Sequence, residues 1–233
     1  MILVSGNGKL ANELVKLSTV ERPIISLSKK DMDITNEYIV SDVIKKYVVS
    51  PNPPKYLIHT AALTKPMKIN DINPIDSLSV NIIGVGNVAR ICKKYGIKFI
   101  YISTDFVYNG KESFDENSRL LPTNNYGWSK LGGECVTRLI DNSLILRCAL
   151  CDIPFRHGVA FDDVYRSSIT HRATASIILK LKDEVGVINI GGETMSVYNF
   201  VSKHQEIKKG LSNKSVPSIN MNTNKMWELL RDE

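Results

Sequence analysis

Two residues one helical turn apart, Tyr126 and Lys130, have the types and the spacing for proton transfer. Residues four apart lie on one face of a helix, so the Tyr126 phenol and the Lys130 ammonium can reach the same site. A cation beside a phenol favours the phenolate, so we expect Lys130 to lower the Tyr126 pKa. Thr104 can add a hydroxyl to the same substrate oxygen if it ends a neighbouring strand. Because the Tyr-x-x-x-Lys spacing alone is common, this chemistry requires a cofactor site nearby.

A glycine-containing turn near the N-terminus is a candidate for that site. It follows the short apolar run at residues 2–5 and reads Ser5, Gly6, Asn7, Gly8, Lys9, Leu10 and Ala11. Glycines let the backbone approach a pyrophosphate, and the start of the next helix offers free N–H groups and a positive dipole end. The position of the turn, between a first strand and a first helix, favours a dinucleotide site over an ordinary tight turn.

The choice of cofactor can be read at the end of the second strand. Sites specific for NAD usually place a carboxylate there to bond the ribose 2′-hydroxyl. Here the segment at 26–30 ends in Ser28, Lys29 and Lys30 and contains no carboxylate. Hydroxyls and cations suit a 2′-phosphate, so we expect NADPH, with NADH as the alternative. Asp33 and Ile34 follow in a turn near the expected place of the adenine.

Strand-like and helix-like segments alternate along the chain. The expected strands are residues 2–5, 23–27, 56–60, 98–104, 143–147 and 187–190. The expected helices follow the glycine turn and cover residues 38–49 (capped by Asn36), 74–95 (stopped by Gly96), 124–141, 173–182 and a last segment from Ser196. Repeated β-α units predict a Rossmann-like α/β fold, a doubly wound parallel sheet with helices on both faces. The zones 106–123 and 151–172 are expected as loops at the carboxyl edge of this sheet.

Composition narrows the class of protein. The chain has 233 residues, of which 43% are hydrophobic and 23% charged, and this suits one large α/β domain. No apolar run approaches the roughly 20 residues of a membrane span, and the N-terminal run is too short for a signal peptide, so we expect a cytoplasmic protein. The net charge of +6 comes from scattered basic residues, which an anionic small molecule explains as well as nucleic acid does. We therefore predict neither a nucleic-acid nor a membrane partner. Four reduced cysteines and no metal site are expected.

Taken together, these segments resemble the extended short-chain dehydrogenases/reductases, and among them the dTDP-4-dehydrorhamnose reductases and related sugar-nucleotide enzymes. The resemblance is carried by residues 5–11, 33–35, 59–64, 103–110, 126–130, 146–147 and 187–192, with Asn81 and Pro122. It implies that Thr104, Tyr126 and Lys130 are catalytic and that Asp105 faces the sugar. The cofactor-binding residues expected from the turn and the resemblance are Ser5, Gly6, Gly8, Lys9, Leu10, Ser28, Lys29, Asp33, Ile34, Ala61, Ala62, Thr64, Tyr126 and Lys130.

The chain departs from this family in two ways. Ser5 and Ala11 stand where the family often has its outer glycines, so an ungapped match keeps only Gly8. Family members are also usually longer, and the missing length lies at 147–173, where the substrate lobe is elaborated.

We expect a nucleotide-binding domain at 1–150 and a small C-terminal substrate lobe at 151–233, from which 187–190 return as a strand to the sheet. Arg156 is a candidate for binding the substrate diphosphate in this lobe, with His157 and Arg166 beside it.

The resemblance implies NADPH-dependent reduction of the 4-keto group of a nucleotide-activated 4-keto-6-deoxy sugar. A 4,6-dehydratase is disfavoured, because such an enzyme would carry an Asp-Glu pair after the Thr, whereas Thr104 is followed by Asp105 and Phe106. An epimerase stays open. So does a non-catalytic scaffold similar to the regulatory subunit of methionine adenosyltransferase, which the short lobe favours. By analogy, the helices at 74–95 and 124–141 are candidates for a homodimer interface.

Overall fold

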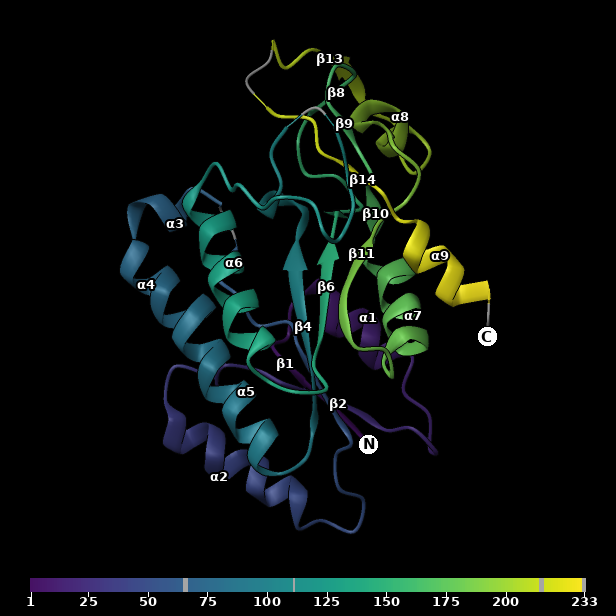
Figure 1. Ribbon diagram of the computed structural model, residues 1–233. Coiled ribbons are helices and arrows are strands. Elements are labelled where there is room, and N and C mark those ends of the chain that lie inside the picture. Colours follow the sequence, from purple (N-terminus) through teal and green to yellow (C-terminus); the bar gives the residue numbers. More distant parts are fainter. Residues whose placement is uncertain (65–66, 111, 214–215, 232–233) are drawn as a thin grey trace.

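A six-stranded parallel sheet forms the centre of the protein, as the computed structural model of residues 1–64, 67–110, 112–213 and 216–231 describes it (Figure 1). The strand order is β2-β1-β3-β4-β6-β11. The six strands are β1 (Ile2–Ser5), β2 (Ile24–Leu27), β3 (Tyr56–His59), β4 (Lys98–Thr104), β6 (Leu144–Cys148) and β11 (Gly186–Ile190). Since both faces of such a sheet are covered, its strands are continuous apolar runs with little alternation.

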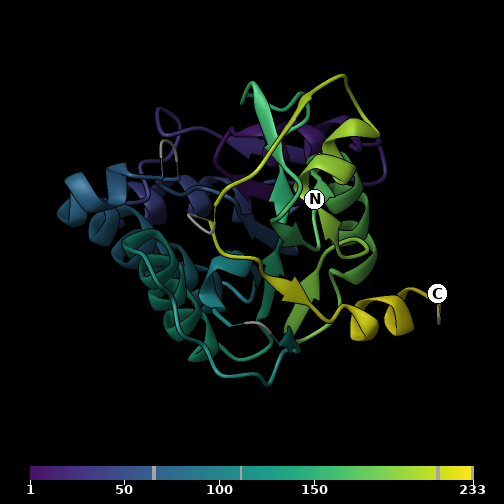
Figure 2. The ribbon, with the colours of Figure 1, turned by 90° about the horizontal axis from the view of Figure 1, so that it is seen from above.

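Helices cover both faces of the sheet, as the doubly wound prediction requires (Figures 1 and 2). One face carries α1 (Lys9–Lys16), α7 (His171–Leu181) and α9 (Asn224–Arg231). The other carries α2 (Glu37–Val48), α3 (Ile69–Ile72), α4 (Pro74–Leu78), α5 (Gly84–Lys94) and α6 (Asn125–Arg138). Two hydrophobic clusters, one on each face, hold these layers to the strands. The predicted fold class is confirmed.

Local signals set several helix ends where the sequence predicts them. The Asn36 side chain caps α2 by accepting hydrogen bonds from the backbone N–H groups of Tyr38 (3.0 Å) and Ile39 (3.3 Å). Gly96 follows α5 in the left-handed region, with φ of +67°. The helix expected over 74–95 differs in one respect, because a π-helical turn (Ser79–Ile83) separates α4 from α5. Asn81 lies in this turn, and its side chain bonds groups outside the helix.

The segments expected as loops contain short strands that close a small lobe above the sheet. We call residues 150–170 and 192–223 the C-terminal lobe. Its elements are β7 (Leu150–Cys151), β8 (Val159–Phe161), β9 (Tyr165–Arg166), β10 (Ile169–Thr170), β12 (Met195–Ser196), α8 (Val197–Ser202), β13 (Lys208–Gly210) and β14 (Asn220–Met221), the last paired with β5 (Ser113–Phe114). Strands of two or three residues have no periodicity to detect, and most of their partners are distant in sequence, so the pattern analysis missed them.

Helix α6 presents an unusual face to the sheet. Its buried residues are small or polar, namely Gly127, Ser129, Lys130, Gly133, Glu134 and Thr137. By contrast, Trp128 and Leu139 point outward, with 51% and 83% of their surface exposed. The close approach to β4 is possible because Gly133 has no side chain: a Cβ there would overlap the Tyr101 hydroxyl and lie 3.0 Å from the Asn81 carbonyl oxygen. The helix is therefore held mainly by polar contacts.

This packing predicts that Gly133→Ala destabilises the protein. The added methyl group has to push α6 away from Tyr101, and overpacking of this kind typically costs about 1–3 kcal/mol. The matched control is Gly86→Ala on α5, where the nearest atom to a Cβ is 3.8 Å away, so the gain in helix propensity of up to ~1 kcal/mol is expected to dominate. Urea unfolding of both variants measures the difference, and equal stabilities would contradict the packing argument.

Candidate active site

The glycine turn lies at the carboxyl edge of the sheet, where strand order reverses between β1 and β3. Chain connections leave β1 and β3 in opposite directions, and ligands of open α/β sheets bind in the crevice at such a point. Gly6 has a φ of +105°, and a Cβ there would lie 2.8 Å from the Ala61 backbone nitrogen. Glycine is thus required at position 6 both by conformation and by close packing.

The start of α1 has the properties of an anion site. Gly8 is its N-cap and contributes no side-chain hydrogen bond, so nothing from the cap satisfies the N–H groups of the first turn. The space where a Gly8 side chain would stand is open for 4 Å. Of the other predicted residues in the turn, Ser5 is buried and its hydroxyl lies 2.8 Å from His59 Nδ1, whereas Leu10 belongs to the core. A pyrophosphate bound at this turn would therefore contact backbone N–H groups at the start of α1.

Lys9, the first residue of α1, turns toward the C-terminal lobe. Its ammonium lies 3.2 Å from a carboxylate oxygen of Asp152. The same carboxylate is near Arg156 (3.6 Å) and His171 (3.7 Å). The predicted phosphate-binding lysine is thus paired with an acid of the lobe in the protein by itself, and a bound phosphate would compete with Asp152 for it.

The end of β2 contains a carboxylate that the sequence analysis missed. Asp31 folds back so that its carboxylate accepts hydrogen bonds from the Ser28 backbone N–H (2.8 Å) and hydroxyl (2.6 Å). Lys29 is highly exposed and lies 3.8 Å from Asp33. Ile34 is buried, and its carbonyl accepts a bond from Asn87. The tight turn at 28–31 brings the Asp31 carboxylate back to Ser28. The sequence analysis considered residues 26–30 only, and therefore found no carboxylate after β2.

The segment after β3 is fixed beside the glycine turn. The Asn81 side chain bonds both backbone groups of Leu63, at 2.7 Å and 3.1 Å, and also donates to the Ser129 hydroxyl at 2.8 Å. Ser129 in turn donates to the Tyr126 carbonyl at 2.8 Å. The π-helical turn therefore links the predicted cofactor segment (Ala61, Ala62 and Thr64, all half-buried) to the helix that carries Tyr126.

Thr104 and Tyr126 come together as predicted. Thr104 ends β4 and is buried, and its hydroxyl lies near enough to the Tyr126 side chain to oppose the rise of the Tyr126 pKa. It also donates to Asp105 at 3.2 Å and accepts the Phe106 N–H at 3.3 Å. Asn124 caps α6 through the Gly127 N–H (2.8 Å) and thereby sets where the Tyr126 turn begins.

The expected lowering of the Tyr126 pKa is wrong for the protein by itself. Burial raises the pKa of Tyr126 above its ordinary value, and the Thr104 hydroxyl opposes this rise only in part. Asp105 and Cys148 raise it further, and the cation that opposes them is Arg166 of the lobe. Lys130 cannot play this part because its ammonium lies over the Tyr101 ring, 4.2 Å from the centroid. Tyr126 is therefore a protonated phenol at neutral pH.

Lys130 is itself a perturbed group. Only 3% of it is exposed, and burial lowers its pKa to about 7, against the opposing effects of Glu134 and Cys148. Nearby, burial together with Lys130 lowers the pKa of His59 to about 3, so this imidazole is neutral. A buried lysine that titrates near neutral pH is common at functional sites.

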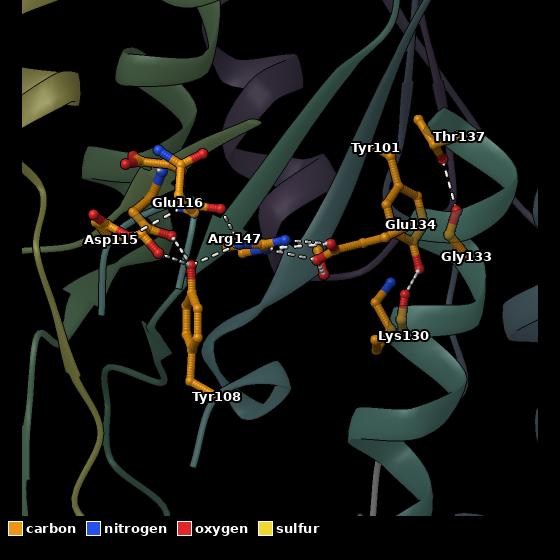
Figure 3. Close-up of polar contacts among 12 residues, drawn as sticks. Tyr101, Tyr108, Asp115, Glu116, Lys130, Gly133, Glu134, Thr137 and Arg147 are labelled. Carbon is orange, nitrogen blue, oxygen red and sulfur yellow. Dashed lines mark hydrogen bonds and ion pairs between the residues drawn. The ribbon is translucent and has the colours of Figure 1, made fainter. Parts of the chain in front are cut away.

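A buried ion pair connects the helix of Tyr126 and Lys130 to the sheet (Figure 3). Arg147 of β6 and Glu134 of α6 are both completely buried, with 2.8 Å between Nη2 and Oε2 and a second contact of 3.1 Å from Nε. Glu134 also accepts the Ser103 hydroxyl at 2.5 Å. The Arg147 Nη1 donates to Tyr108 at 2.7 Å and to the Glu116 carbonyl at 3.1 Å. Burial opposes the Arg147 charge, but the bonds with Glu134 outweigh it and raise its pKa.

The residues predicted for the substrate are separated in the structure. Asp105 lies beside the predicted catalytic trio of Thr104, Tyr126 and Lys130. It is 1% exposed and is paired with Arg166, whose side chain is 18% exposed. Arg156, by contrast, is largely exposed and pairs with Asp152 on the side of Lys9. The sequence analysis named Arg166 with Arg156 and His157 as a candidate for holding the substrate diphosphate, and the structure instead pairs Arg166 with Asp105 beside Thr104.

Over the part of the chain that the structure describes, no group of three His, Cys, Asp or Glu side chains is arranged to hold a metal ion. Cys148 and Cys151 are thiols, and burial raises the pKa of Cys151 to about 11. In the same described ranges, every helix is too short or too polar to cross a membrane.

A parallel sheet that brings a glycine turn, a strand-end Thr and a Tyr–Lys helix to one edge defines a protein of the short-chain dehydrogenase/reductase class. Residues 1–151 match the family model described as "RmlD substrate binding domain", and the chain belongs to this family.

Two curated relatives illustrate the similarity. The dTDP-4-keto-6-deoxy-D-glucose reductase of Streptomyces niveus is 29% identical over 165 residues, which is 68% of this chain and 54% of the relative. The dTDP-4-dehydrorhamnose reductase of Aggregatibacter actinomycetemcomitans is 24% identical over 202 residues, or 84% and 65%. The chain thus spans between about half and two thirds of these relatives. The structure of dTDP-4-dehydrorhamnose reductase from Bacillus anthracis, a complex with NADP, superposes with a TM-score of 0.82 at 23% identity, covering 97% of this chain and 92% of that one, and this likeness concerns the fold.

The depressed pKa of Lys130 predicts a pH-dependent cost of its burial. Unfolded lysine stays charged to about pH 10.4, whereas Lys130 in the folded protein loses its proton near pH 7. Between these values the unfolded chain binds the extra proton, so the stability of the wild type should rise by about 1.4 kcal/mol per pH unit relative to Lys130→Met. Urea unfolding at pH 7, 8 and 9 measures this difference. For Lys180→Met, at an exposed position, the difference from wild type should stay constant. A constant difference for Lys130→Met as well would contradict the pKa.

Proposed function

We propose that the protein is an NADPH-dependent reductase of the 4-keto group of a nucleotide-activated 4-keto-6-deoxy sugar. The observation that carries this proposal is the meeting of the strand-end Thr104, the helix of Tyr126 and the glycine turn at one edge of the sheet. Membership of the family and the activities after which the two relatives are named favour this substrate class. The same reasoning places the substrate between the trio and the C-terminal lobe.

The residues at the edge fit a dinucleotide. The uncapped first turn of α1, the open space at Gly8 and the close contact at Gly6 would receive the pyrophosphate by backbone N–H groups. Ala61, Ala62 and Thr64 would flank the nicotinamide half, and Lys130 would hold its ribose. When bound, the cofactor supplies the hydride for C4 of the sugar.

Tyr126 would give the proton. Because burial keeps its phenol protonated at neutral pH, it is suited to donate to the oxygen that becomes an alkoxide at C4. Thr104 would hydrogen-bond the same oxygen and stabilise its developing charge. Asp105 would contact the sugar hydroxyls.

NADPH is favoured over NADH by the exposed Lys29 and by the complex of the Bacillus anthracis enzyme with NADP. The Asp31 carboxylate at the end of β2 is engaged by Ser28, so a 2′-phosphate would meet Lys29 and Lys30 on the solvent side. The cytoplasm, where such a soluble cofactor is used, is the location we propose.

One assay distinguishes the proposed reductase from both alternatives, an epimerase and a non-catalytic scaffold. An epimerase returns its hydride and consumes no NADPH, and a scaffold that only binds the cofactor consumes none either. Loss of the NADPH absorbance in the presence of a 4-keto-6-deoxy sugar nucleotide is therefore the result that we expect, and tight binding without any loss would overturn the proposal.

Tyr126→Phe is expected to reduce turnover by about 10²–10⁴-fold, because it removes the proton donor. Binding of NADPH, followed by its fluorescence, should change by less than about twofold, since the ring is kept. The matched control is Tyr38→Phe, on the exposed side of α2, which should retain the activity of the wild type. Full activity of Tyr126→Phe would show that another group supplies the proton.

We further propose a homodimer through the outer faces of α3 to α6. These faces carry two apolar stripes: Ile72, Ile75 and Ile83 on one side, and Trp128 and Leu139 on the other. All five side chains are between 49% and 83% exposed, whereas the buried side of α6 is polar. A second copy of this surface would cover both stripes, and large exposed apolar patches commonly mark such interfaces.

The double variant Ile75→Glu/Leu139→Glu should convert the dimer to a monomer, because it would place four carboxylates in the covered surface. Light scattering coupled to size exclusion measures the mass. Val20→Glu, at another exposed apolar position near the end of α1, is the control and should leave the mass unchanged. A wild type that is monomeric at high concentration would contradict the proposal.

A further inference from the structure

One arginine of the C-terminal lobe reaches the buried edge of the sheet. The Arg166 Nε donates to Asp105 Oδ2 at 3.0 Å, and its Nη2 makes a closer contact with the same oxygen. Asp105 directly follows Thr104 and is 1% exposed, so its carboxylate has little water to solvate it. A buried carboxylate requires such a partner to remain charged at low cost.

Arg166 also contacts the ring beside Tyr126. Its guanidinium lies over the Phe106 ring, 4.7 Å from the centroid. Phe106 in turn meets the Tyr126 ring edge-on, with 6.1 Å between centroids and 72° between planes. Arg166 therefore holds two consecutive residues, Asp105 and Phe106, both of which hydrogen-bond the Thr104 hydroxyl.

The lobe fixes the backbone of Arg166 from two directions. It lies in β9, which pairs antiparallel with β12 in the register Arg166↔Met195. On its other side it forms a bridge with Ile219, and the preceding N–H of Tyr165 donates to Ser218 at 2.9 Å. These contacts come from two separate parts of the lobe, β12 and residues 218–219, so the position of Arg166 depends on whether the lobe is folded onto the sheet.

We propose that Arg166 is a positioning residue, through which the C-terminal lobe holds Asp105 and Phe106 in the geometry that Tyr126 requires for proton transfer. This inference rests on the proposed function. It explains how so small a lobe can still complete the site, because the single side chain of Arg166 connects the lobe to Asp105 and Phe106. The groups that face Tyr126 are Thr104 and Asp105 after β4, Cys148 of β6 and Arg166 of β9, and of these only Arg166 is a cation.

The charge of Arg166 has a definite effect on the phenol. Asp105 raises the Tyr126 pKa, and Arg166 lowers it, so the cation opposes the effect of the carboxylate when both are present. Without Arg166, a buried anion is left beside the phenol, which then releases its proton less readily. Removing the Asp105 charge at the same time should bring the Tyr126 pKa back toward its value in the wild type.

A double-mutant cycle tests this inference on the reductase reaction. Arg166→Gln should lower kcat by about 10–100-fold with little change in KM. In an Asp105→Asn background the same substitution should change kcat by less than threefold. Arg166→Lys, which keeps the charge but loses the planar fork, should fall between Arg166→Gln and the wild type. Equal losses in both backgrounds, or a loss confined to KM, would overturn the inference and make Arg166 a direct substrate ligand.

A second measurement needs no substrate. Nitration by tetranitromethane attacks the phenolate, so its rate at Tyr126, located by peptide mass spectrometry with Tyr126→Phe as reference, reports proton release. Arg166→Gln should slow nitration at least fivefold, and the added Asp105→Asn should restore it. An unchanged rate would overturn the inference whatever the enzyme reduces. The expected nitration pattern in a protein that reduces no keto sugar would instead sink the proposed function and leave the role of Arg166 intact.

Discussion

The geometry of the candidate site depends on one buried ion pair, Arg147 with Glu134. Neither side chain has any exposed surface, so desolvation would make the pair costly without the fork of hydrogen bonds that joins them and the Ser103 hydroxyl that completes Glu134. The pair connects β6 to the middle of α6, one turn beyond Lys130. Because the buried face of α6 has almost no apolar side chains, this polar contact decides where the helix sits, and hence where Tyr126 and Lys130 lie.

The same pair extends into the rest of the molecule (Figure 3). From Arg147 it continues to the Tyr108 hydroxyl, which lies 2.8 Å from Asn189 of β11. The Asn189 N–H donates to Glu116 at 2.8 Å, and its amide reaches the carbonyl of Asn222, which leads into α9. Helix α6, the loop after β4 and the C-terminal segment thus meet in one satisfied polar cluster, which explains why charged residues can lie in the core.

The fold and the approach of Thr104 to the helix of Tyr126 could be predicted because their signals are local. Apolar runs, the Asn36 cap and the turn at Gly6 each determine structure within a few residues. Three features were missed, and two of them depend on partners that are distant in sequence. Asp31 lies outside the window that suggested an uncharged end of β2, Lys9 is drawn toward Asp152, and Lys130 stacks on Tyr101 and leaves Arg166 to act on Tyr126. A signal did exist for the ion pair, since Arg147 interrupts an apolar strand and Glu134 falls on the same helical face as Lys130.

The position of β11 in the sheet has a consequence for how the protein is made. Asn189 pairs in register with Arg147, and the polar cluster closes only when residues 186–190 have added the edge strand. During synthesis the chain emerges from its N-terminus, so β6 is exposed as an open edge while Tyr108, to which Arg147 donates, still lacks its hydrogen bond with Asn189. The Arg147–Glu134 pair can form before this stage, but the outer part of the polar cluster is completed last. Nascent chains of this protein should therefore pass through a stage with a nearly complete sheet and an open edge at β6, and chaperones would recognise the chain at that stage.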